Sequence, residues 1–387
     1  MARRVPPPIE MMRALIARPT ISSADPALDQ SNLPVIHLLA DWLQAIGFKV
    51  EIQELTDRKA NLIATLGDAE SGDGLVLSGH TDTVPFDDGR WTMDPFRGSL
   101  GDDVLYGLGS ADMKSFLALT IEAASRIDVK RLRRPLVILA TADEESSMAG
   151  ARRLAAQQRR LGRYCVIGEP TGLVPVRMHK GVMMESIRID GRSGHSSDPE
   201  RGANAIDGMH AVIGALLQAR EDLRHARQDP AFPVPHATLN LGSIRGGDNP
   251  NRICGHCALQ FDVRPLPGTQ LDSVRADLRA RIAAALARQP ELSWTLQPLF
   301  DGVPPFETPA AAELVEACEQ VAGHRAIGVS FGTEAPYLSA LGLETVVLGP
   351  GHIAQAHQPD EYLPLSHVEP CLDILARLLD RFCTRDG

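Results

Sequence analysis

Four short segments that are apolar on both faces constrain the fold of this chain more than any other feature of its sequence. They span residues 75–78, 136–141, 165–168 and 345–349. A strand with one solvated face alternates apolar and polar side chains, so these segments predict strands of a parallel sheet that is covered on both sides. Helical patterns lie between them, at residues 116–127, 149–160 and 311–321. The alternation predicts a helix-covered, mostly parallel α/β sheet.

The segment 182–298 follows a different pattern and predicts an inserted α+β domain. The strands and helices expected there have the order β-α-β-β-α-β, which is that of the ferredoxin-like unit. Their expected ranges are 182–189, 203–223, 237–244, 257–263, 271–287 and 293–299. A chain of 387 residues also suits two domains, at roughly 150 residues for each. We therefore expect residues 1–181 and 299–387 to form one α/β domain that is interrupted by the insert.

Charge and composition exclude several classes of protein. Lys plus Arg (39) against Asp plus Glu (49) leaves a formal net charge of −10, and nucleic-acid binding depends on neutralising phosphates, so no nucleic-acid partner is expected. No apolar run approaches the ~18 residues of a membrane span. The proline-containing N-terminus does not resemble an export signal, so we expect a cytoplasmic protein without a membrane partner. Cys254 and Cys257 are interpreted as a reduced pair, because no second such pair follows them.

Ionisable residues follow the apolar strands at the points where these strands end. Open α/β sheets bind ligands outside the carboxyl ends of their strands. A single His or Glu at such a position is more often a solvated loop residue, but several from separate segments indicate a shared site. The residues expected at this edge are His80, Asp82, Asp112, Glu144, Glu145, Glu169 and His357.

Carboxylates that converge on one rim repel one another unless cations neutralise them. The mixture of imidazole and carboxylate groups suits zinc, or cobalt or manganese by substitution. Two ions about 3.5–4 Å apart that share one carboxylate would use the whole set. In the adjacent pair Glu144 and Glu145, one side chain can bind metal while the other acts as a general base. Asp82 could hydrogen-bond the second ring nitrogen of His80.

Longer motifs connect the chain with a known family. They are SGHTDTVP, GLGSADMK, ADEESS, GEPT, SGHSSDP and QAHQPDEY, with shorter matches such as ALDQSN, PFDDGRWT, HKG, RPLPG, TEAP and LGPG. Together they resemble the motifs of the M20 family of two-zinc metallopeptidases and deacylases, over nearly the whole chain. The resemblance implies an α/β catalytic domain with an inserted ferredoxin-like lid domain. It also implies an active enzyme, because every metal and base position of the family is matched.

The resemblance implies a specific set of metal ligands. His80 and Glu169 would hold one zinc ion, Glu145 and His357 would hold the other, and Asp112 would bridge the two.

Three further residues would act in catalysis by the same resemblance. Glu144 would deprotonate the attacking water and return the proton to the leaving amine, and Asp82 would orient His80. His195 stands in Ser193-Gly-His195, and by its sequence alone it is more often a structural loop residue. In the family the matching histidine reaches the active site of the partner subunit and stabilises the oxyanion. The insert would then serve as both lid and dimerisation domain, and we expect a homodimer.

The expected substrate is an Nα-acylated amino acid, whose carboxylate suits bidentate capture by arginine. Arg264 matches the family position for this contact, with Asn251 and Arg252 as second candidates, although both arginines could be ordinary surface residues. Glu334 could pair with a substrate ammonium or serve as a carboxylate at a helix N-terminus. The resemblance implies hydrolysis of Nα-acetyl-L-ornithine to acetate and L-ornithine, in arginine biosynthesis. Succinyl-diaminopimelate, acetylcitrulline and di- or tripeptides are the alternative substrates.

Two other classes of function fit the sequence less well. Gly107 and Gly109 begin a pattern typical of dinucleotide binding, but Asp112 stands where a third glycine is needed. A non-catalytic metal-binding module predicts loss of the base or of a ligand, and the chain keeps all of them.

Overall fold

The computed structural model describes residues 5–68, 72–87 and 89–384, and the chain divides into two compact units. The first unit comprises Met1–Arg177, Thr308–Ile327 and Thr333–Gly387, and the second comprises Met178–Glu307 and Gly328–Gly332. The first four residues of the N-terminal segment, and Asp88 of the motif PFDDGRWT, lie outside the described residues. The domain boundaries expected at 181/182 and 298/299 stay predictions.

The first unit is built on a mixed sheet whose central strands are parallel. Its order is β1-β2-β6-β3-β7-β15-β8, followed by the short strand β13, with β14 beside β8. Strands β6, β3, β7 and β15 pair in parallel, and the strands on either side of them pair antiparallel. The bounds are β1 (Lys49–Glu54), β2 (Ala60–Leu66), β3 (Leu75–His80), β6 (Leu136–Thr141), β7 (Tyr164–Ile167), β8 (Val176–His179), β13 (Phe306–Glu307), β14 (Ile327–Val329) and β15 (Glu344–Val347).

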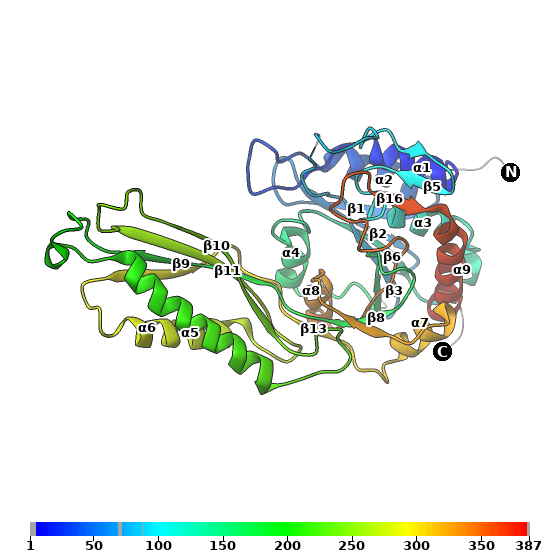
Figure 1. Ribbon diagram of the computed structural model, residues 1–387. Helices are drawn as coiled ribbons and strands as arrows, with labels where there is room; N and C mark the ends of the chain where they lie inside the picture. The colour runs from blue at the N-terminus through cyan, green and yellow to red at the C-terminus, as the bar shows by residue number, and fades with distance from the viewer. Residues whose placement is uncertain (1–4, 69–71, 88, 385–387) are drawn as a thin grey trace. The chain divides into compact units, whose positions relative to one another are not determined.

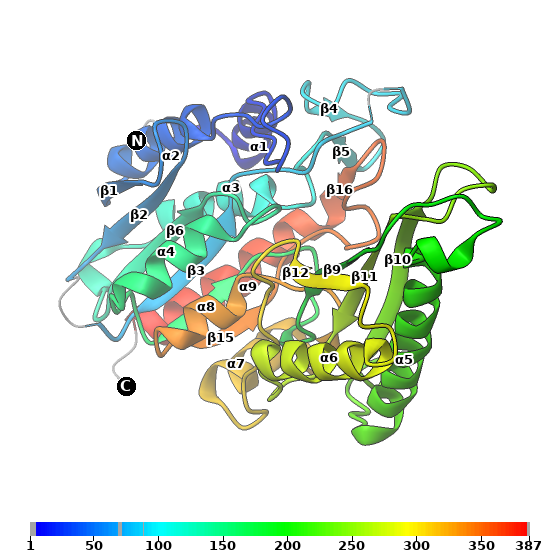
Figure 2. The ribbon, with the colours of Figure 1, turned by 90° about the vertical axis from the view of Figure 1, so that its left-hand side faces the viewer.

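Helices cover this sheet on both faces, which confirms the predicted fold class (Figures 1 and 2). Every side chain of β3, β6 and β7 is buried, as the apolar runs predict. On one face α1, α3, α9 and α7 contact one another in that order, and on the other face α4 contacts α8. The bounds are α1 (Pro8–Ile16), α2 (Leu33–Ala45), α3 (Lys114–Ser125), α4 (Ala149–Gln157), α7 (Glu313–Ala322), α8 (Ala335–Ala340) and α9 (Val368–Leu379).

A small three-stranded sheet lies beside the main one in the first unit. Its order is β16-β5-β4, with β4 (Ser99–Leu100), β5 (Val104–Tyr106) and β16 (Tyr362–Pro364). Strand β16 pairs antiparallel with β5, so two segments more than 250 positions apart in the sequence meet here. This pairing brings the residues before β16 close to the loop after β5.

The second unit has the element order predicted for the insert. The bounds are β9 (Met183–Asp190), α5 (Ala205–Ala226), β10 (Thr238–Gly246), β11 (His256–Arg264), α6 (Leu271–Leu286) and β12 (Ser293–Pro298). Its four strands form an antiparallel sheet of order β10-β11-β9-β12. Helices α5 and α6 contact each other, and α5 contacts β10, β11 and β9.

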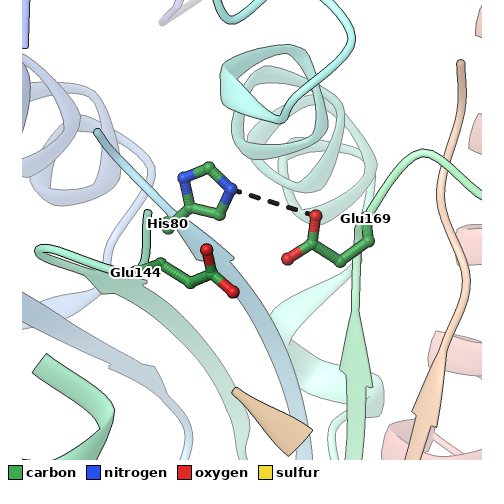
Figure 3. A group of neighbouring side chains, drawn as sticks. All are labelled: His80, Glu144 and Glu169. Carbon is green, nitrogen blue, oxygen red and sulfur yellow. Dashed lines mark ion pairs between the residues drawn. The ribbon is translucent and has the colours of Figure 1, made fainter. Parts of the chain in front are cut away.

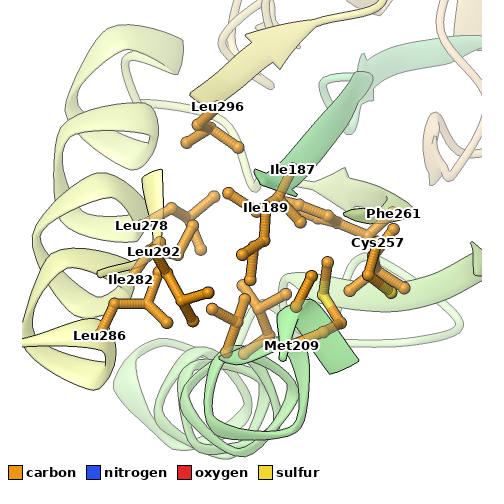
Figure 4. Close-up of a cluster of buried hydrophobic side chains, with 14 of the residues drawn as sticks. Ile187, Ile189, Met209, Cys257, Phe261, Leu278, Ile282, Leu286, Leu292 and Leu296 are labelled. Atoms are coloured by element: carbon orange, nitrogen blue, oxygen red, sulfur yellow. The ribbon is translucent and has the colours of Figure 1, made fainter. Parts of the chain in front are cut away.

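One apolar core holds the second unit together (Figure 4). Side chains alternate between buried and more exposed along β9, so that Ile187 and Ile189 point to the helices while their neighbours do not. Met209 of α5 and Ile282 of α6 are fully buried against this face. Each such side chain contributes about 1.5–3 kcal/mol by its removal from water. The unit therefore has its own core, independent of the main sheet.

Two further expectations concern cysteines and membranes. Each of the six cysteines is a free, buried thiol, including Cys254 and Cys257. Among the helices of the described residues, none combines the length and the apolar character that crossing a bilayer requires.

Candidate metal centre

Three neighbouring parallel strands deliver their carboxyl ends to one place in the first unit. Strand β3 ends at His80, and its neighbours β6 and β7 run parallel to it on either side. Glu144 and Glu145 follow the end of β6, and Glu169 follows the end of β7. Because parallel strands end at the same edge of a sheet, these side chains arrive together.

Asp112 lies between two histidines. Its Oδ1 is 3.0 Å from Nε2 of His80, and its Oδ2 is 3.5 Å from Nε2 of His357. His357 Nε2 also lies 3.1 Å from Oε1 of Glu145, and His80 Nε2 lies 3.9 Å from Oε2 of Glu169 (Figure 3). The structure thus brings five predicted residues together as two His–Glu pairs, one on each oxygen of Asp112.

Glu144 belongs to the same cluster. One ligand atom each from His80, Glu144 and Glu169 lies within 4.8 Å of the others, and Figure 3 shows their side chains directed toward one another. The same holds for His80, Asp112 and Glu145. Glu144 is therefore close enough either to bind a metal ion or to act on a molecule bound beside it.

The donor set fits divalent metal ions. Glu169 Oε1 is buried and has no hydrogen-bond partner among the residues that the structure describes. A buried carboxylate oxygen without a partner is costly, and a metal ion would supply the missing contact. Imidazole nitrogens and carboxylate oxygens are the ligands of zinc and of similar first-row ions.

Electrostatics in the cluster favour a cation. Burial raises the pKa of Glu144 well above its ordinary value, and burial together with the charge of Asp112 does the same for Glu169. The hydrogen bond with Glu145 raises the pKa of His357 to about 9. Burial lowers the pKa of His80, but its hydrogen bond with Asp112 and the surrounding carboxylates outweigh this and raise it. All four shifts favour the protonated form, so added positive charge is favourable in this cluster.

Asp82 connects His80 with the Glu144–Glu145 turn. Its carboxylate accepts hydrogen bonds from the backbone N–H groups of Glu144 (3.2 Å) and Glu145 (3.0 Å). The Nδ1 atom of His80 lies 3.0 Å from the backbone carbonyl oxygen of Asp82 and 3.7 Å from the carboxylate oxygen Oδ1 of Asp82. Asp82 was expected to hydrogen-bond this nitrogen, and in the structure its backbone carbonyl makes the contact while its carboxylate accepts from the two N–H groups. Burial raises the pKa of Asp82 to about 6.

Lys59 and Ser22, which were not predicted as site residues, hold the turn that carries Glu144. Asp143 adopts a left-handed backbone conformation (φ 58°), which is costly for a residue other than glycine. Its carboxylate accepts hydrogen bonds from Lys59 Nζ (2.7 Å) and the Ser22 hydroxyl (2.9 Å). Lys59 is only 4% exposed. A lysine directly before a buried apolar strand was the signal in the sequence, since a buried ammonium needs an acidic partner.

Glu334 lies in the first unit, beside strands β3 and β6 near their carboxyl ends. It is 1% exposed and stands at the N-terminus of α8. Its carboxylate accepts hydrogen bonds from the hydroxyls of Ser78 on β3 and Thr141 on β6. The two roles considered from the sequence, a carboxylate at a helix N-terminus and a partner for a substrate ammonium, stay predictions.

The other predicted residues lie in the second unit. His195 is on a loop, where its Nδ1 lies 2.8 Å from the Ser197 hydroxyl. Its backbone forms a bridge with Arg252, and the Ser196 N–H donates to the Asn251 carbonyl. These two loops therefore lie side by side.

Arg264 lies at the end of β11, apart from those loops in the sequence. Its Nε is 2.9 and 3.0 Å from the two carboxylate oxygens of Asp262. Its side chain is 28% exposed, so the guanidinium is held in place by Asp262 and remains accessible.

Comparison with known proteins bears on this arrangement. The family model described as "Peptidase family M20/M25/M40" matches residues 76–381. Acetylornithine deacetylases from Yersinia pseudotuberculosis and Yersinia pestis are each 48% identical over 388 residues, covering 99% of this chain and 99% of theirs.

Solved structures share the fold at low sequence identity. An M20 family metallo-carboxypeptidase from Sulfolobus solfataricus has a TM-score of 0.77 at 16% identity, covering 98% of this chain and 99% of its own. A tripeptidase from Staphylococcus aureus has a TM-score of 0.76 at 18% identity, covering 97% of both chains. The resemblance seen in the sequence motifs is thereby confirmed, as is the expectation of a hydrolase. The chain belongs to peptidase family M20/M25/M40 and is a homologue of the acetylornithine deacetylases.

Proposed function

We propose that this protein is a two-zinc amidohydrolase that cleaves Nα-acetyl-L-ornithine to acetate and L-ornithine, a step of arginine biosynthesis. The observation that carries the chemistry is the position of Asp112, whose Oδ1 lies 3.0 Å from His80 Nε2 and whose Oδ2 lies 3.5 Å from His357 Nε2. The choice of substrate is supported by the relatives that are 48% identical over nearly the whole chain. A cytoplasmic location, and cobalt as a substitute for zinc, remain predictions from the sequence.

The metal ions would be divided between the two His–Glu pairs. His80 and Glu169 would hold one zinc ion, Glu145 and His357 would hold the second, and Asp112 would contact both. Bound zinc would polarise the scissile carbonyl and lower the pKa of a water molecule. The close N–O distances within each pair support this division.

Glu144 would move the proton in this reaction. Its backbone N–H donates to Asp82, and burial raises its pKa well above the ordinary value, which makes the carboxylate a stronger base. Glu144 takes a proton from water as the water oxygen attacks the amide carbon. It then gives that proton to the nitrogen as the C–N bond breaks, so that acetate and a free amine leave.

Substrate recognition would fall to the second unit. Arg264, which Asp262 holds in place, would bind the substrate carboxylate, with Asn251 and Arg252 as further contacts. His195 would donate to the oxyanion of the partner subunit's reaction. The hydrolysis of succinyl-diaminopimelate, acetylcitrulline or di- and tripeptides is the alternative, because the same metal chemistry would serve each substrate.

A homodimer would place His195 in this role, and the second unit has a suitable edge. Within the described residues β10 pairs only with β11, so one side of β10 is left without a strand partner. Ile244 on β10 is 54% exposed, and Ile206 at the start of α5 is 46% exposed. An open strand edge with apolar side chains is a template for pairing with a second chain.

Acetate release tests the proposed reaction directly. Purified protein should release acetate rapidly from Nα-acetyl-L-ornithine, should lose this activity with a chelator and should regain it when zinc is added back. Succinyl-diaminopimelate, acetylcitrulline and a dipeptide serve as comparison substrates. If the protein hydrolyses one of them but not Nα-acetyl-L-ornithine, the proposed metal chemistry stands and the proposed substrate is refuted.

Replacing Glu144 should separate metal binding from turnover. Glu144→Gln keeps the shape of the side chain but cannot carry the proton, so turnover should fall by about 10²–10⁴-fold, with the zinc content unchanged by elemental analysis. Glu51→Gln, on exposed β1, is the matched control and should behave like the wild type. An active Glu144→Gln enzyme would refute the role of Glu144.

Metal uptake should release protons at pH 7. His357, with a pKa of about 9 in the metal-free protein, is protonated at pH 7, and a histidine must be neutral to bind metal. The affinity for zinc should therefore rise as the pH rises from 6 toward 9. Calorimetric titration in two buffers of different ionisation enthalpy measures the released protons. A binding enthalpy independent of the buffer would contradict the involvement of His357.

Subunit mixing tests whether His195 serves the partner's active site. His195→Ala alone should lower the rate by about 10²–10³-fold, as for other oxyanion donors. A mixed dimer of His195→Ala and Glu144→Gln subunits contains one site in which both groups are intact. Activity should therefore reappear when the two variants exchange subunits. If native mass spectrometry detects mixed dimers and these dimers are inactive, His195 does not act across the interface.

A further inference from the structure

Glu361 is a buried carboxylate close to the metal centre that the proposed reaction does not use. It is 2% exposed and lies between His357 and strand β16. Its Oε1 accepts hydrogen bonds from the backbone N–H groups of Ala111 (2.8 Å) and Asp112 (3.0 Å). Its Oε2 accepts one from the backbone N–H of Gly109 (3.2 Å). One side chain thus satisfies three donors of the loop that ends at Asp112.

The loop is shaped to take this carboxylate. Gly109 adopts φ +80°, and a side chain there would come within 2.8 Å of Thr83. Backbone N–H groups that converge in this way form an anion-binding concavity. The N–H of Gly107 also donates to the backbone carbonyl of Glu361 (2.9 Å), so the loop wraps around this residue from both ends.

Lys114 is a second buried ionisable residue near this loop. It is fully buried and donates to the backbone carbonyl of Arg18 (2.9 Å) at the end of α1. Burial lowers the pKa of Lys114 to about 7, and the charge of Glu361 acts in the opposite direction. Burial raises the pKa of Glu361 to about 8, while the hydrogen bonds from the three backbone N–H groups act in the opposite direction. These three donors hold the Glu361 side chain in place.

We propose that Glu361 is a positioning residue for the carboxylate of Asp112. It would act through the backbone: its side chain fixes the 109–112 loop, while its own main chain continues from the segment that carries His357. The two segments that meet at one metal position would then be set relative to each other by a single buried side chain. This inference rests on the metal centre proposed above and goes beyond it.

The proposal predicts an effect on both metal positions. Asp112 presents one oxygen to His80 and the other to His357, so a shift of its backbone would disturb both. Loss of a group that orients a metal ligand typically weakens metal binding by about 10–100-fold. A residue that only stabilised the fold would lower the melting temperature and leave the metal affinity of the folded protein unchanged.

The test is a metal titration of the full-length Glu361→Gln protein. The amide retains one acceptor oxygen but turns an NH₂ group toward an N–H donor. With a competing chelator, we expect about 10–100-fold weaker binding of Zn²⁺ at both positions and a changed visible spectrum of the Co²⁺-loaded protein. Glu122→Gln is the matched control, because Glu122 is a buried carboxylate on α3 that pairs with Arg126, and it should bind metal like the wild type. Wild-type affinity and spectrum in Glu361→Gln would overturn the proposal.

A second variant separates position from charge and covers the case in which Glu361→Gln does not fold. Glu361→Asp keeps the negative charge but is one methylene too short to reach all three N–H donors. Weaker binding in Glu361→Asp supports positioning, whereas wild-type affinity would show that only the charge matters and would overturn the proposal. The wild-type titration distinguishes failure of the proposed metal centre from failure of the proposed role of Glu361. A wild type that binds no metal refutes the proposed function itself, and a wild type that binds two ions leaves the variants to decide on Glu361.

Discussion

Repulsion between buried carboxylates at one edge of the sheet is the constraint on which the rest of this structure depends. Glu144, Glu169 and Asp112 are each less than a tenth exposed and share a space that also receives His80. Such a cluster is unfavourable unless positive charge is bound within it. The strands deliver the side chains to this place, so the fold itself creates the demand for cations.

The residues around the cluster hold its members in place, and each comes from a different part of the chain. Asp82 binds the backbone of the Glu144–Glu145 turn. Lys59 holds the left-handed Asp143 just before that turn. Glu334 joins β3 to β6, because its carboxylate accepts hydrogen bonds from the hydroxyls of Ser78 and Thr141. Such contacts restrict the orientation of metal ligands, which is a large part of what makes a metal site selective and reactive.

The buried faces of the elements and the gathering of polar residues at the strand ends could be predicted from the sequence, and the contacts that hold those residues in place could not. The apolar runs and the β-α-β-β-α-β order predicted both sheets, because periodicity reports directly on which faces are buried. Helix α1 was missed, since its prolines and arginines were considered only against an export signal; Met11, Met12 and Leu15 are nevertheless buried. The partners of Lys59, Glu334 and Asp82 were not predictable, because spacing along the chain does not show which of several donors lies nearest in space.

The two histidines stand far apart along the chain, and this has a consequence for biosynthesis. His357 follows His80 by 277 positions in the sequence. A chain that is still being synthesised can form β3 and its neighbours before the segment with His357 exists. During that interval the carboxylates are gathered without one of the two imidazoles. The centre can therefore be completed only after the segment that carries His357 has been synthesised, so both metal positions cannot be loaded before then.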